Sequence, residues 1–303
     1  MSHYTRWGAL PLAGGLLLGL LGSLPGTHLP VEAPFRLGLT HTVIRSQNQT
    51  DILAAMKVWA EVIREESGLD VDSQVRVFSD LDQAVAALRD RQVEGLTLSL
   101  PEYAVMPPGL LGGPFFRDEV DGSTRVRFAL VAARGGPVKG VQDLRDARLV
   151  VHDSENSEVA VAWLDAQLAA AGLGRLRGTA AVKLEQKASS AVLGVFFGTA
   201  DACLVRLGVF ESVAELNPQV ARRLMVVAQS EPIAPSLFAF RAGVPEEVRN
   251  RFVQEVLSLH ESTTGQQVMR VFRADRMQEV TADEVVRSTR LYLGWIREAG
   301  GLR

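Results

Sequence analysis

Short apolar runs alternate with longer amphipathic runs from Phe35 to the middle of the chain. The apolar runs are FRLGLT at 35–40, QVRVFS at 74–79 and GLTLSL at 95–100, and the amphipathic runs cover 52–67 and 80–89. Each apolar run has the length of a strand, and each amphipathic run has apolar residues at helical spacing. This order predicts a βαβαβ unit with a mostly parallel sheet and right-handed connections.

The same alternation returns after Asp121-Gly122, which is a turn signal. The strands predicted there lie at 125–134, 148–153, 180–185, 200–205, 223–230 and 236–242, and the helices at 157–171, 190–197 and 210–216. From Pro245 onward the pattern is helical, with an amphipathic stretch over 246–257 and a capping box at 281–284 before the last helix.

Two successive α/β units predict a two-lobed α/β protein with a hinge and a cleft between the lobes. We expect residues 34–122 together with 231–303 to form lobe one, and residues 123–230 to form lobe two. The long apolar run RVRFALVAAR is expected to cross between them. A chain of 303 residues is long enough for two such units. Open α/β folds bind ligands at the carboxyl ends of their strands, so the cleft is the expected site.

The N-terminal segment has the pattern of an export signal. His3 and Arg6 precede an uncharged run from Trp7 to Leu24 that is rich in Leu, Gly and Ala. Small residues stand at the usual positions before a cleavage point after Ala33, but a Pro follows. We therefore expect residues 1–33 to be a signal peptide or an uncleaved membrane anchor. A buried first helix is disfavoured because Gly and Pro interrupt the run.

Composition excludes several classes of function. The net charge of −3 and the dispersed Lys and Arg residues give no basic patch for nucleic acid. Cys203 is the only cysteine, so no internal disulfide can form, and the His residues lack metal-ligand spacing. There is no G-x-S-x-G motif, Walker loop or pairing of a nucleophile with a base. We therefore predict no catalytic residue, no metal and no cofactor.

The stretch HDSENSE joins a predicted strand to a predicted helix and is the main candidate site. The free N–H groups of the first helical turn, with donors from Ser154, Asn156 and Ser157, could hold an anion. Glu155 and Glu158 oppose this, because like charges about 5 Å apart repel by about 3 kcal/mol at an effective dielectric near 20. The alternative is that Ser154 or Asn156 only caps the helix.

Further candidates follow other predicted strands. Thr40 ends the first strand, and Tyr103 follows the third, where its ring could wall the cleft and its hydroxyl could bond a ligand. Arg206 follows the strand ADACLV and could bind a carboxylate or a similar oxyanion through two hydrogen bonds. Ser189 and Ser190 begin a predicted helix and could donate to a ligand. The alternatives are a surface Tyr, a solvated Arg and plain helix-capping Ser residues.

Two weaker candidates, Arg45 and Asn48, lie in the loop after the first strand. Since 28 of the 32 basic residues are Arg, a solvated surface position is the alternative for any single Arg.

The order of these pieces resembles the periplasmic substrate-binding proteins of phosphonate, phosphite and phosphate ABC transporters, a branch of the type II periplasmic binding fold. The resemblance covers about residues 35–259. It is carried by LGLT, LSLPEYAVM, DGSTRVRFALVAARGGPVKGVQDLRDARLVV, AVLGVFFGTADACLV and VVAQSEPIAPSLFAFRAGVPEEVRNRFVQEVLSL, the last with Ser230 and Pro232.

The resemblance implies an exported, periplasmic receptor without catalysis. Such a receptor closes on a small oxyanion and delivers it to a membrane permease or a sensor kinase. The ligand contacts implied are Tyr103 in lobe one, and in lobe two the helix N-terminus at 155–158 and the polar helix start at 188–190.

Two positions depart from the family's pattern. Family members carry a Ser-Thr-Ser-Gly run where this chain has 154–158, and usually a His where it has Ala188, so Lys187 or the Ser residues after it would have to supply donors. We therefore expect phosphate or a simple phosphonate to bind poorly, and a cationic or zwitterionic ligand, or none, to be the alternative. The alternative functions are an interaction or sensor module that has lost the oxyanion site and an enzyme on the same fold, such as a deaminase or phosphoribosyl transferase.

Overall fold

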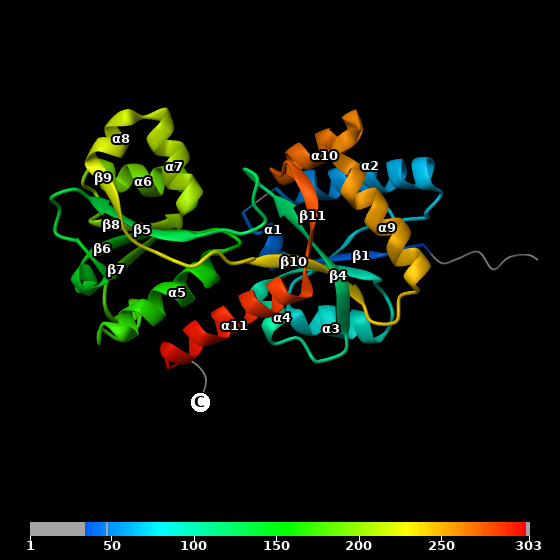
Figure 1. Cartoon of the computed structure of the whole chain (residues 1–303), viewed down its shortest axis with the longest axis horizontal. Coiled ribbons are helices and arrows are strands. Elements are labelled where there is room, and N and C mark those ends of the chain that lie inside the picture. Colours follow the sequence, from blue (N-terminus) through cyan, green and yellow to red (C-terminus); the bar gives the residue numbers. More distant parts are fainter. Residues whose placement is uncertain (1–33, 47, 301–303) are drawn as a thin grey trace, which may run out of the picture. The chain divides into compact units, whose positions relative to one another are not determined.

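The structure is a computed structural model that describes residues 34–46 and 48–300. It contains two β-sheets and the helices that cover them (Figure 1). The segment 1–33, for which the sequence predicts an export signal or an anchor, lies outside the described residues. Among the helices of the described chain, none is both long and apolar enough to cross a membrane.

The first sheet has six strands in the order β11-β4-β10-β3-β1-β2. They are β1 (Leu37–Thr40), β2 (Arg76–Phe78), β3 (Gly95–Ser99), β4 (Leu111–Glu119), β10 (Ser236–Arg241) and β11 (Arg276–Val280). β1 pairs parallel with β2 and β3, whereas β10 is antiparallel to β3 and β4, and β11 to β4. The ends of β1, β3 and β4 therefore lie at one edge, together with the start of β10.

Helices cover both faces of this sheet. They are α1 (His41–Ile44), α2 (Gln49–Ser67), α3 (Leu81–Arg89), α4 (Leu100–Ala104), α9 (Glu246–Ser258) and α10 (Thr263–Phe272), and a 3₁₀ turn, η3, covers Leu259–Glu261. α2, α9 and α10 lie on one side and α3 on the other (Figure 1). Phe252 of α9 stacks on Phe35 and Phe238, with ring centroids 4.5 and 5.3 Å apart. This aromatic cluster fastens α9 to the sheet.

The second sheet has five strands in the order β7-β6-β8-β5-β9. They are β5 (Phe128–Ala133), β6 (Arg148–His152), β7 (Ala181–Glu185), β8 (Ala202–Arg206) and β9 (Leu224–Gln229). β6 is parallel to β7 and β8, and β5 is antiparallel to β8 and β9. His152 and Arg206 thus end neighbouring parallel strands at the same edge.

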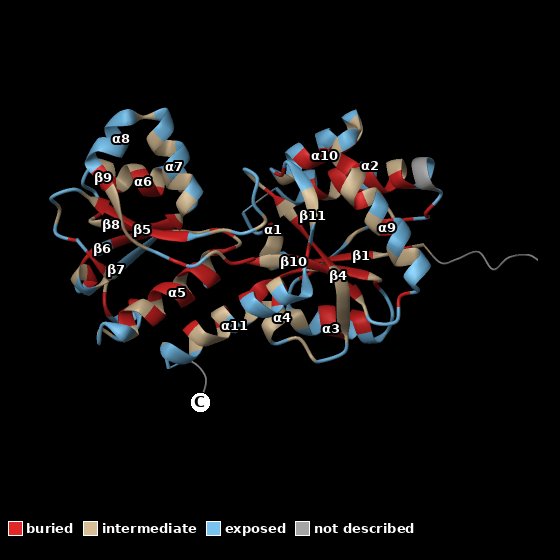
Figure 2. Cartoon of the chain, viewed as in Figure 1, coloured by how far each residue is buried: buried red, intermediate tan, exposed pale blue. Residues whose placement is uncertain are grey.

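The second sheet is also covered on both faces. Its helices are α5 (Ser157–Ala170), α6 (Ala188–Phe196), α7 (Leu207–Leu216) and α8 (Pro218–Arg223), with 3₁₀ turns η1 (Val141–Leu144) and η2 (Leu176–Gly178). Figure 2 shows α5 buried along much of its length. Tyr292 and Trp295 of the last helix, α11 (Ala282–Glu298), lie in the same hydrophobic cluster as Trp163 of α5. α11 therefore packs against the second sheet's core.

Two chain segments connect the sheets. Val126 and Ile233 exchange backbone hydrogen bonds of 2.9 and 3.0 Å, so the outgoing and returning segments pair antiparallel. The buried Ser230 hydroxyl accepts from the Phe128 N–H at 2.9 Å. α11 is tied to the returning segment because the Ala234 N–H donates to Ser288. This is the position expected of a hinge.

Most strands and helices lie where the hydrophobic pattern predicts them. Asp80 caps α3 by accepting from the Gln83 N–H, and Thr281 caps α11 by accepting from the Glu284 N–H. One helix start differs from the pattern: α2 begins at Gln49 rather than at residue 52, and Asn48 is its N-cap. The Asn48 side chain accepts from the Thr50 N–H at 3.0 Å, which is one of the free N–H groups of the first helical turn.

Two strands of the first sheet were not predicted. β4 contains Gly113-Pro114, and a register shift against β10 between Phe238 and Phe240 accommodates this step. β11 lies in the part of the chain that was expected to be wholly helical. That expectation was wrong, because β11 is held by β4, more than 150 residues earlier.

Both sheets are mixed rather than mostly parallel. The strands β5 and β10 follow the two connecting segments and each pairs antiparallel with its neighbours. All strands of the first sheet come from 34–122 and 231–303, and all strands of the second from 123–230. The lobe boundaries stay a prediction, since α11 packs on the core of the second sheet.

Candidate functional site

Polar side chains gather at the carboxyl end of the first sheet. The Glu102 carboxylate accepts hydrogen bonds from the Thr40 hydroxyl at 2.7 Å, the Thr42 hydroxyl at 2.9 Å, and both the N–H and hydroxyl of Ser99 at 2.8 Å. Ser99 and Glu102 also form a capping box at the start of α4. We call these four residues the first polar edge. Thr40, a predicted ligand contact, is fully buried, and its hydroxyl donates its hydrogen bond to Glu102.

Tyr103 lies on the α4 side of this edge and is part of a hydrophobic cluster. Its ring makes a T-shaped contact with Phe115, with centroids 6.0 Å apart. Burial raises the pKa of the Tyr103 hydroxyl. With Val286 and Leu293 of α11, it also lines a hollow of about 460 Å³. The ring therefore serves as a wall between α4 and α11.

The turn before α5 is bonded internally. Ser154 and Asn156 are buried, and the Ser154 carbonyl accepts from both the N–H and the hydroxyl of Ser157, at 3.1 and 2.9 Å. Asn156 is the N-cap residue of α5, but its side chain makes no capping hydrogen bond and donates to Glu155 instead. Capping by a side chain is therefore the wrong interpretation of this turn.

The turn is bridged by the loop that follows α1. The Arg45 guanidinium donates to the Asp153 carboxylate at 3.0 Å, the Ser154 carbonyl at 2.6 Å and the Ser157 hydroxyl at 2.7 Å. Ser46 donates its hydroxyl proton to the Glu155 carboxylate. These bonds link a loop beside the first sheet to the turn that follows β6 of the second sheet, so the acceptors of this turn face lobe one.

Glu155 and Glu158 have different environments. Glu155 faces Ser46, whereas Glu158 accepts a hydrogen bond from the Tyr292 hydroxyl of α11 at 3.1 Å. Burial, and then the neighbouring Glu158 carboxylate, raise the pKa of Tyr292 above its ordinary value. Glu158, one of the two carboxylates expected to repel an anion, is therefore hydrogen-bonded to α11.

His152 and Arg206 lie together at the carboxyl end of the second sheet. Burial lowers the pKa of the His152 imidazole, and the Arg206 guanidinium lowers it further. The Nε–H of Arg206 is buried and has no hydrogen-bond partner among the described residues. A buried donor without a partner costs about 1–3 kcal/mol, so this group has unused capacity for an acceptor. Together with Asp153 and Glu155, these residues form what we call the second polar edge.

Sequence reasoning missed His152. The available signal was its place as the last residue of a buried parallel strand, the same signal that pointed to Arg206.

Ser189 and Ser190 lie within the first turn of α6. The N-cap is Lys187, which makes no side-chain capping bond. The alternative, that Ser189 or Ser190 caps this helix, is therefore wrong, because the helix begins at Ala188. Ser189 is exposed and Ser190 is half-buried.

Metal and thiol chemistry find no support in the described part of the chain. No group of three or more His, Cys, Asp or Glu residues there could hold a metal ion. The Cys203 thiol is fully buried in β8, and burial raises its pKa to about 12. A thiol in this state is unreactive at neutral pH.

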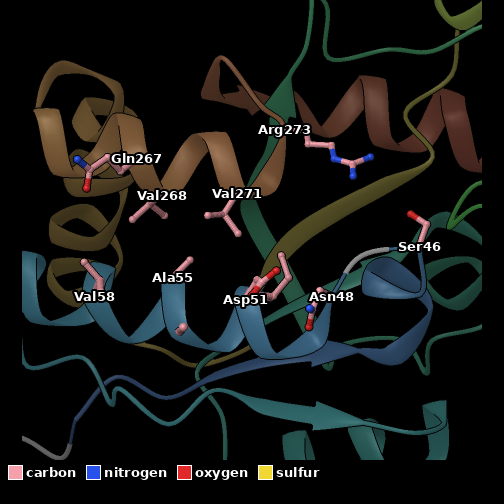
Figure 3. Close-up of a pocket in the computed structure, with 11 residues that line it drawn as sticks. Ser46, Asn48, Asp51, Ala55, Val58, Gln267, Val268, Val271 and Arg273 are labelled. Atoms are coloured by element: carbon pink, nitrogen blue, oxygen red, sulfur yellow. The ribbon is translucent and has the colours of Figure 1, made fainter.

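A second hollow, of about 510 Å³, lies between α2 and α10 (Figure 3). Val58 of α2 and Val268 and Val271 of α10 line it from opposite sides, and Asp51 and Arg273 are among its polar lining residues. Neither hollow is lined by a residue of the second polar edge.

Two sheets with covered faces, joined by paired crossing segments and presenting polar strand ends, define a protein of the type II periplasmic binding fold. The family model described as the periplasmic substrate-binding protein of a phosphonate ABC transporter matches residues 42–285. The chain therefore belongs to this family, whose members are periplasmic and bind substrates rather than transform them.

Solved structures show the same fold at low identity. XAC2383 from Xanthomonas citri, solved with bound ATP, has a TM-score of 0.65 at 13% identity, covering 89% of this chain and 100% of that one. A binding component of the ABC phosphonate transporter from Pseudomonas aeruginosa has a TM-score of 0.57 at 13% identity, covering 88% and 87%. PhnD1 from Prochlorococcus marinus, in complex with methylphosphonate, has a TM-score of 0.58 at 12% identity, covering 88% and 98%.

A search of curated protein sequences finds no match. The structural neighbours confirm the predicted fold class, and the family match confirms the predicted family.

Proposed function

We propose that this protein captures a small polar ligand between its first and second polar edges and delivers it to a membrane permease, without catalysis. The observation that carries the proposal is the buried Nε–H of Arg206, which lacks a partner among the described residues and lies beside His152. An acidic group on a ligand would satisfy this donor through a charge-assisted hydrogen bond. Family membership supports the same role.

The other predicted ligand contacts differ in exposure and therefore in the role that we propose for each. Ser157 and Ser190 present hydroxyls near the starts of α5 and α6, and Ser189 is accessible beside them. Ser154 and Asn156 are buried and would shape the turn. From lobe one, Tyr103 would add an aromatic wall, and the buried Thr40, which donates to Glu102, would hold the first polar edge in shape behind it.

The charges favour a zwitterionic ligand over a simple oxyanion. Arg206 provides the positive group, whereas Glu155 and Asp153 provide acceptors that already bind donors from lobe one. A ligand with an acidic group at Arg206 and an ammonium group near Glu155 would meet both. Phosphate near Glu155 would meet a like charge, which weakens its binding.

Isothermal titration calorimetry of the full chain tests this proposal. The probes are methylphosphonate, phosphite, phosphate, sulfate and an aminoalkylphosphonate, each also followed by NMR for chemical change. We expect the zwitterion to bind best and no probe to be transformed. No binding by any probe would overturn the proposal, and turnover would favour an enzyme.

Matched variants locate the site. Arg206→Ala should weaken the best ligand by about tenfold to a hundredfold, the value of a charge-assisted hydrogen bond. Arg222→Ala, on an exposed position of α8, should leave affinity unchanged. Glu155→Gln should strengthen phosphate binding, while Glu158→Gln should not, because Glu158 is bonded to Tyr292. Equal effects of the two Glu variants would contradict this arrangement.

One observation favours the alternative of an interaction module without a small-molecule site. Arg45 and Ser46 already donate to the acceptors of the turn before α5. If the protein is such a module, then no probe binds to the wild type or to Arg45→Ala. If Arg45 only competes with the ligand, Arg45→Ala binds the zwitterion more tightly than the wild type does.

A further inference from the structure

β7 is an edge strand of the second sheet with uncovered apolar side chains. In the described chain it pairs only with β6, and its other edge is free. Val182 is 40% exposed and Leu184 is 60% exposed. Figure 2 shows the strand in the colour of exposed residues. Most strands of this protein are buried, so this strand is an exception.

The backbone of β7 also has unused hydrogen-bonding groups. The Ala181 N–H donates to the Ala147 carbonyl of the chain before β6, and the Glu185 carbonyl accepts from the Asp153 N–H after it. In a parallel pair, the backbone N–H and C=O groups of alternate residues point to the partner strand. Those of Ala181, Lys183 and Glu185 point to β6. The N–H and C=O groups of Val182 and Leu184 therefore point to the open edge, which can accept a further strand.

The exposed side chains continue the apolar face that α5 covers. In the register of β6 and β7, Val182 lies beside Leu149 and Leu184 beside Val151, and both β6 residues are buried under α5. The same apolar face thus extends beyond the helix onto β7. Pairing with another strand would supply the missing neighbours along this edge.

The charges of β7 suit a second copy of this chain. Lys183 and Glu185 share the opposite face of the strand, with Nζ and Oε2 3.9 Å apart, and the Lys183 side chain is 74% exposed. An antiparallel pairing centred on Leu184 places Leu184 opposite its own copy and Lys183 opposite Glu185 of the other copy, twice. The register centred on Lys183 would instead place two Lys side chains together.

We propose that two copies of this protein associate through antiparallel pairing of their β7 edges, which makes one continuous sheet across both. Short length and an outward Lys are also devices that keep edge strands monomeric. In the proposed register, however, Lys183 lies opposite Glu185 of the other copy, so its charge attracts the second strand instead of repelling it. The proposal does not depend on the ligand or on the proposed function.

Sedimentation velocity of the full chain over a wide concentration range tests the association. We expect a reversible dimer in the wild type and a monomer for Leu184→Lys, which places two ammonium groups together at the centre of the interface. Leu216→Lys, at an 87% exposed position at the end of α7, is the matched control and should dimerise as the wild type does. Because both positions are exposed, both variants should fold, which circular dichroism checks.

Charge exchange tests the register. Lys183→Glu and Glu185→Lys should each weaken dimerisation by about tenfold, since each turns two attractive cross-strand pairs into repulsive ones. The double variant restores opposite charges and should recover the wild-type dissociation constant. A wild type that stays monomeric, a dimer that Leu184→Lys leaves intact, or a double variant that fails to recover would overturn the proposal.

Discussion

The carboxyl ends of the two sheets differ in how their polar groups are satisfied. At the first polar edge, the hydroxyls of Thr40, Thr42 and Ser99 all donate to one carboxylate, that of Glu102. At the second polar edge, carboxylates accept from the other lobe, and the Arg206 Nε–H has no partner among the described residues. We call the first edge closed on itself, because its hydroxyl donors all have an acceptor within the edge. The second edge keeps a donor that could bind an acceptor on a ligand.

This difference shows that polarity at a strand end is a weak guide to binding. Both edges present carboxylates and other polar side chains at the carboxyl ends of parallel strands. A buried polar group must be hydrogen-bonded in any case, and most such groups find their partners within the protein. A buried donor without a partner is a stronger guide, and the Arg206 Nε–H at the second polar edge is such a donor among the described residues.

The largest effect is expected at the first polar edge. Glu102→Ala should lower the free energy of unfolding by about 2–4 kcal/mol, because it leaves buried donors of Thr40 and Ser99 without an acceptor. Urea denaturation measures this as a shift in midpoint at constant slope. Glu65→Ala, at an exposed position of α2, is the control and should cost far less. Equal losses in the two variants would mean that the first edge is not closed on itself.

The second-largest effect is expected at the hydrogen bond between Tyr292 and Glu158, which joins α11 to α5. Tyr292→Phe removes its hydrogen bond to Glu158 and should lower stability by about 1–2 kcal/mol. The control, Tyr103→Phe, removes a hydroxyl that has no described protein partner. Chemical denaturation compares the two variants with the wild type. If Tyr292→Phe is neutral while Glu158→Gln alters ligand affinity, Glu158 belongs to the second polar edge.

The same Tyr gives a pH dependence with a defined sign. The pKa of Tyr292 is raised in the folded protein, whereas the unfolded chain releases this proton near pH 10. Above about pH 10 the native state therefore binds more protons than the unfolded state, and stability falls as pH rises. Tyr292→Phe should lose this contribution, which denaturation at pH 9 and pH 11 would measure. A steeper alkaline loss in the variant would contradict the assignment.

Local signals in the sequence predicted those parts of the fold that local physics determines. Asp80 and Thr281 cap helices because their side chains bond N–H groups three residues away. β4 and β11 could not be predicted in this way, because each is stabilised by a strand far away in the chain. The Gly113-Pro114 step makes β4 harder still, since its register shift depends on β10.

The site divides along the same line. Strand ends predicted Arg206 and Thr40 as neighbours of the cleft edges, but they could not show that Glu102 satisfies Thr40. Whether Glu155 or Glu158 faces lobe one depends on α11, which lies more than 120 residues further along the chain. The role of Arg45 depends on how close its loop comes to α5, and no periodicity records such a distance.

The electrostatics of the second polar edge can be measured at His152. Its pKa lies below the ordinary value, chiefly through burial and then through Arg206, while Glu155 acts in the opposite direction. NMR titration should find that Arg206→Gln raises this pKa and Glu155→Gln lowers it further. Arg222→Gln should leave it unchanged.

The lowered pKa of His152 also affects stability. Below about pH 6.5 the unfolded chain takes up a proton at this position that the folded protein does not, so the stability contribution falls as pH falls. His152→Gln should show a weaker acid dependence than the wild type, as measured by urea midpoints at pH 7.5 and 5. If His152 titrates as in an unfolded peptide in every variant, the imidazole is not a neighbour of Arg206.

The smallest effect concerns the bridge between the two edges. Side chains of Arg45 and Asp153 are 43% and 22% exposed, so a double-mutant cycle should give a coupling of only about 0.2–1 kcal/mol at low salt. Added salt should reduce it.

The Arg148–Asp201 pair, also exposed but lying wholly within lobe two, is the reference cycle. Because Arg45 and Asp153 lie beside different sheets, any separation of the two sheets should reduce their coupling and leave that of Arg148 and Asp201 unchanged. A ligand that binds at the turn before α5 should reduce the Arg45 coupling further, since it competes for the same acceptors. Equal responses of both pairs to ligand would show that Arg45 is a surface contact, and that the two polar edges act independently.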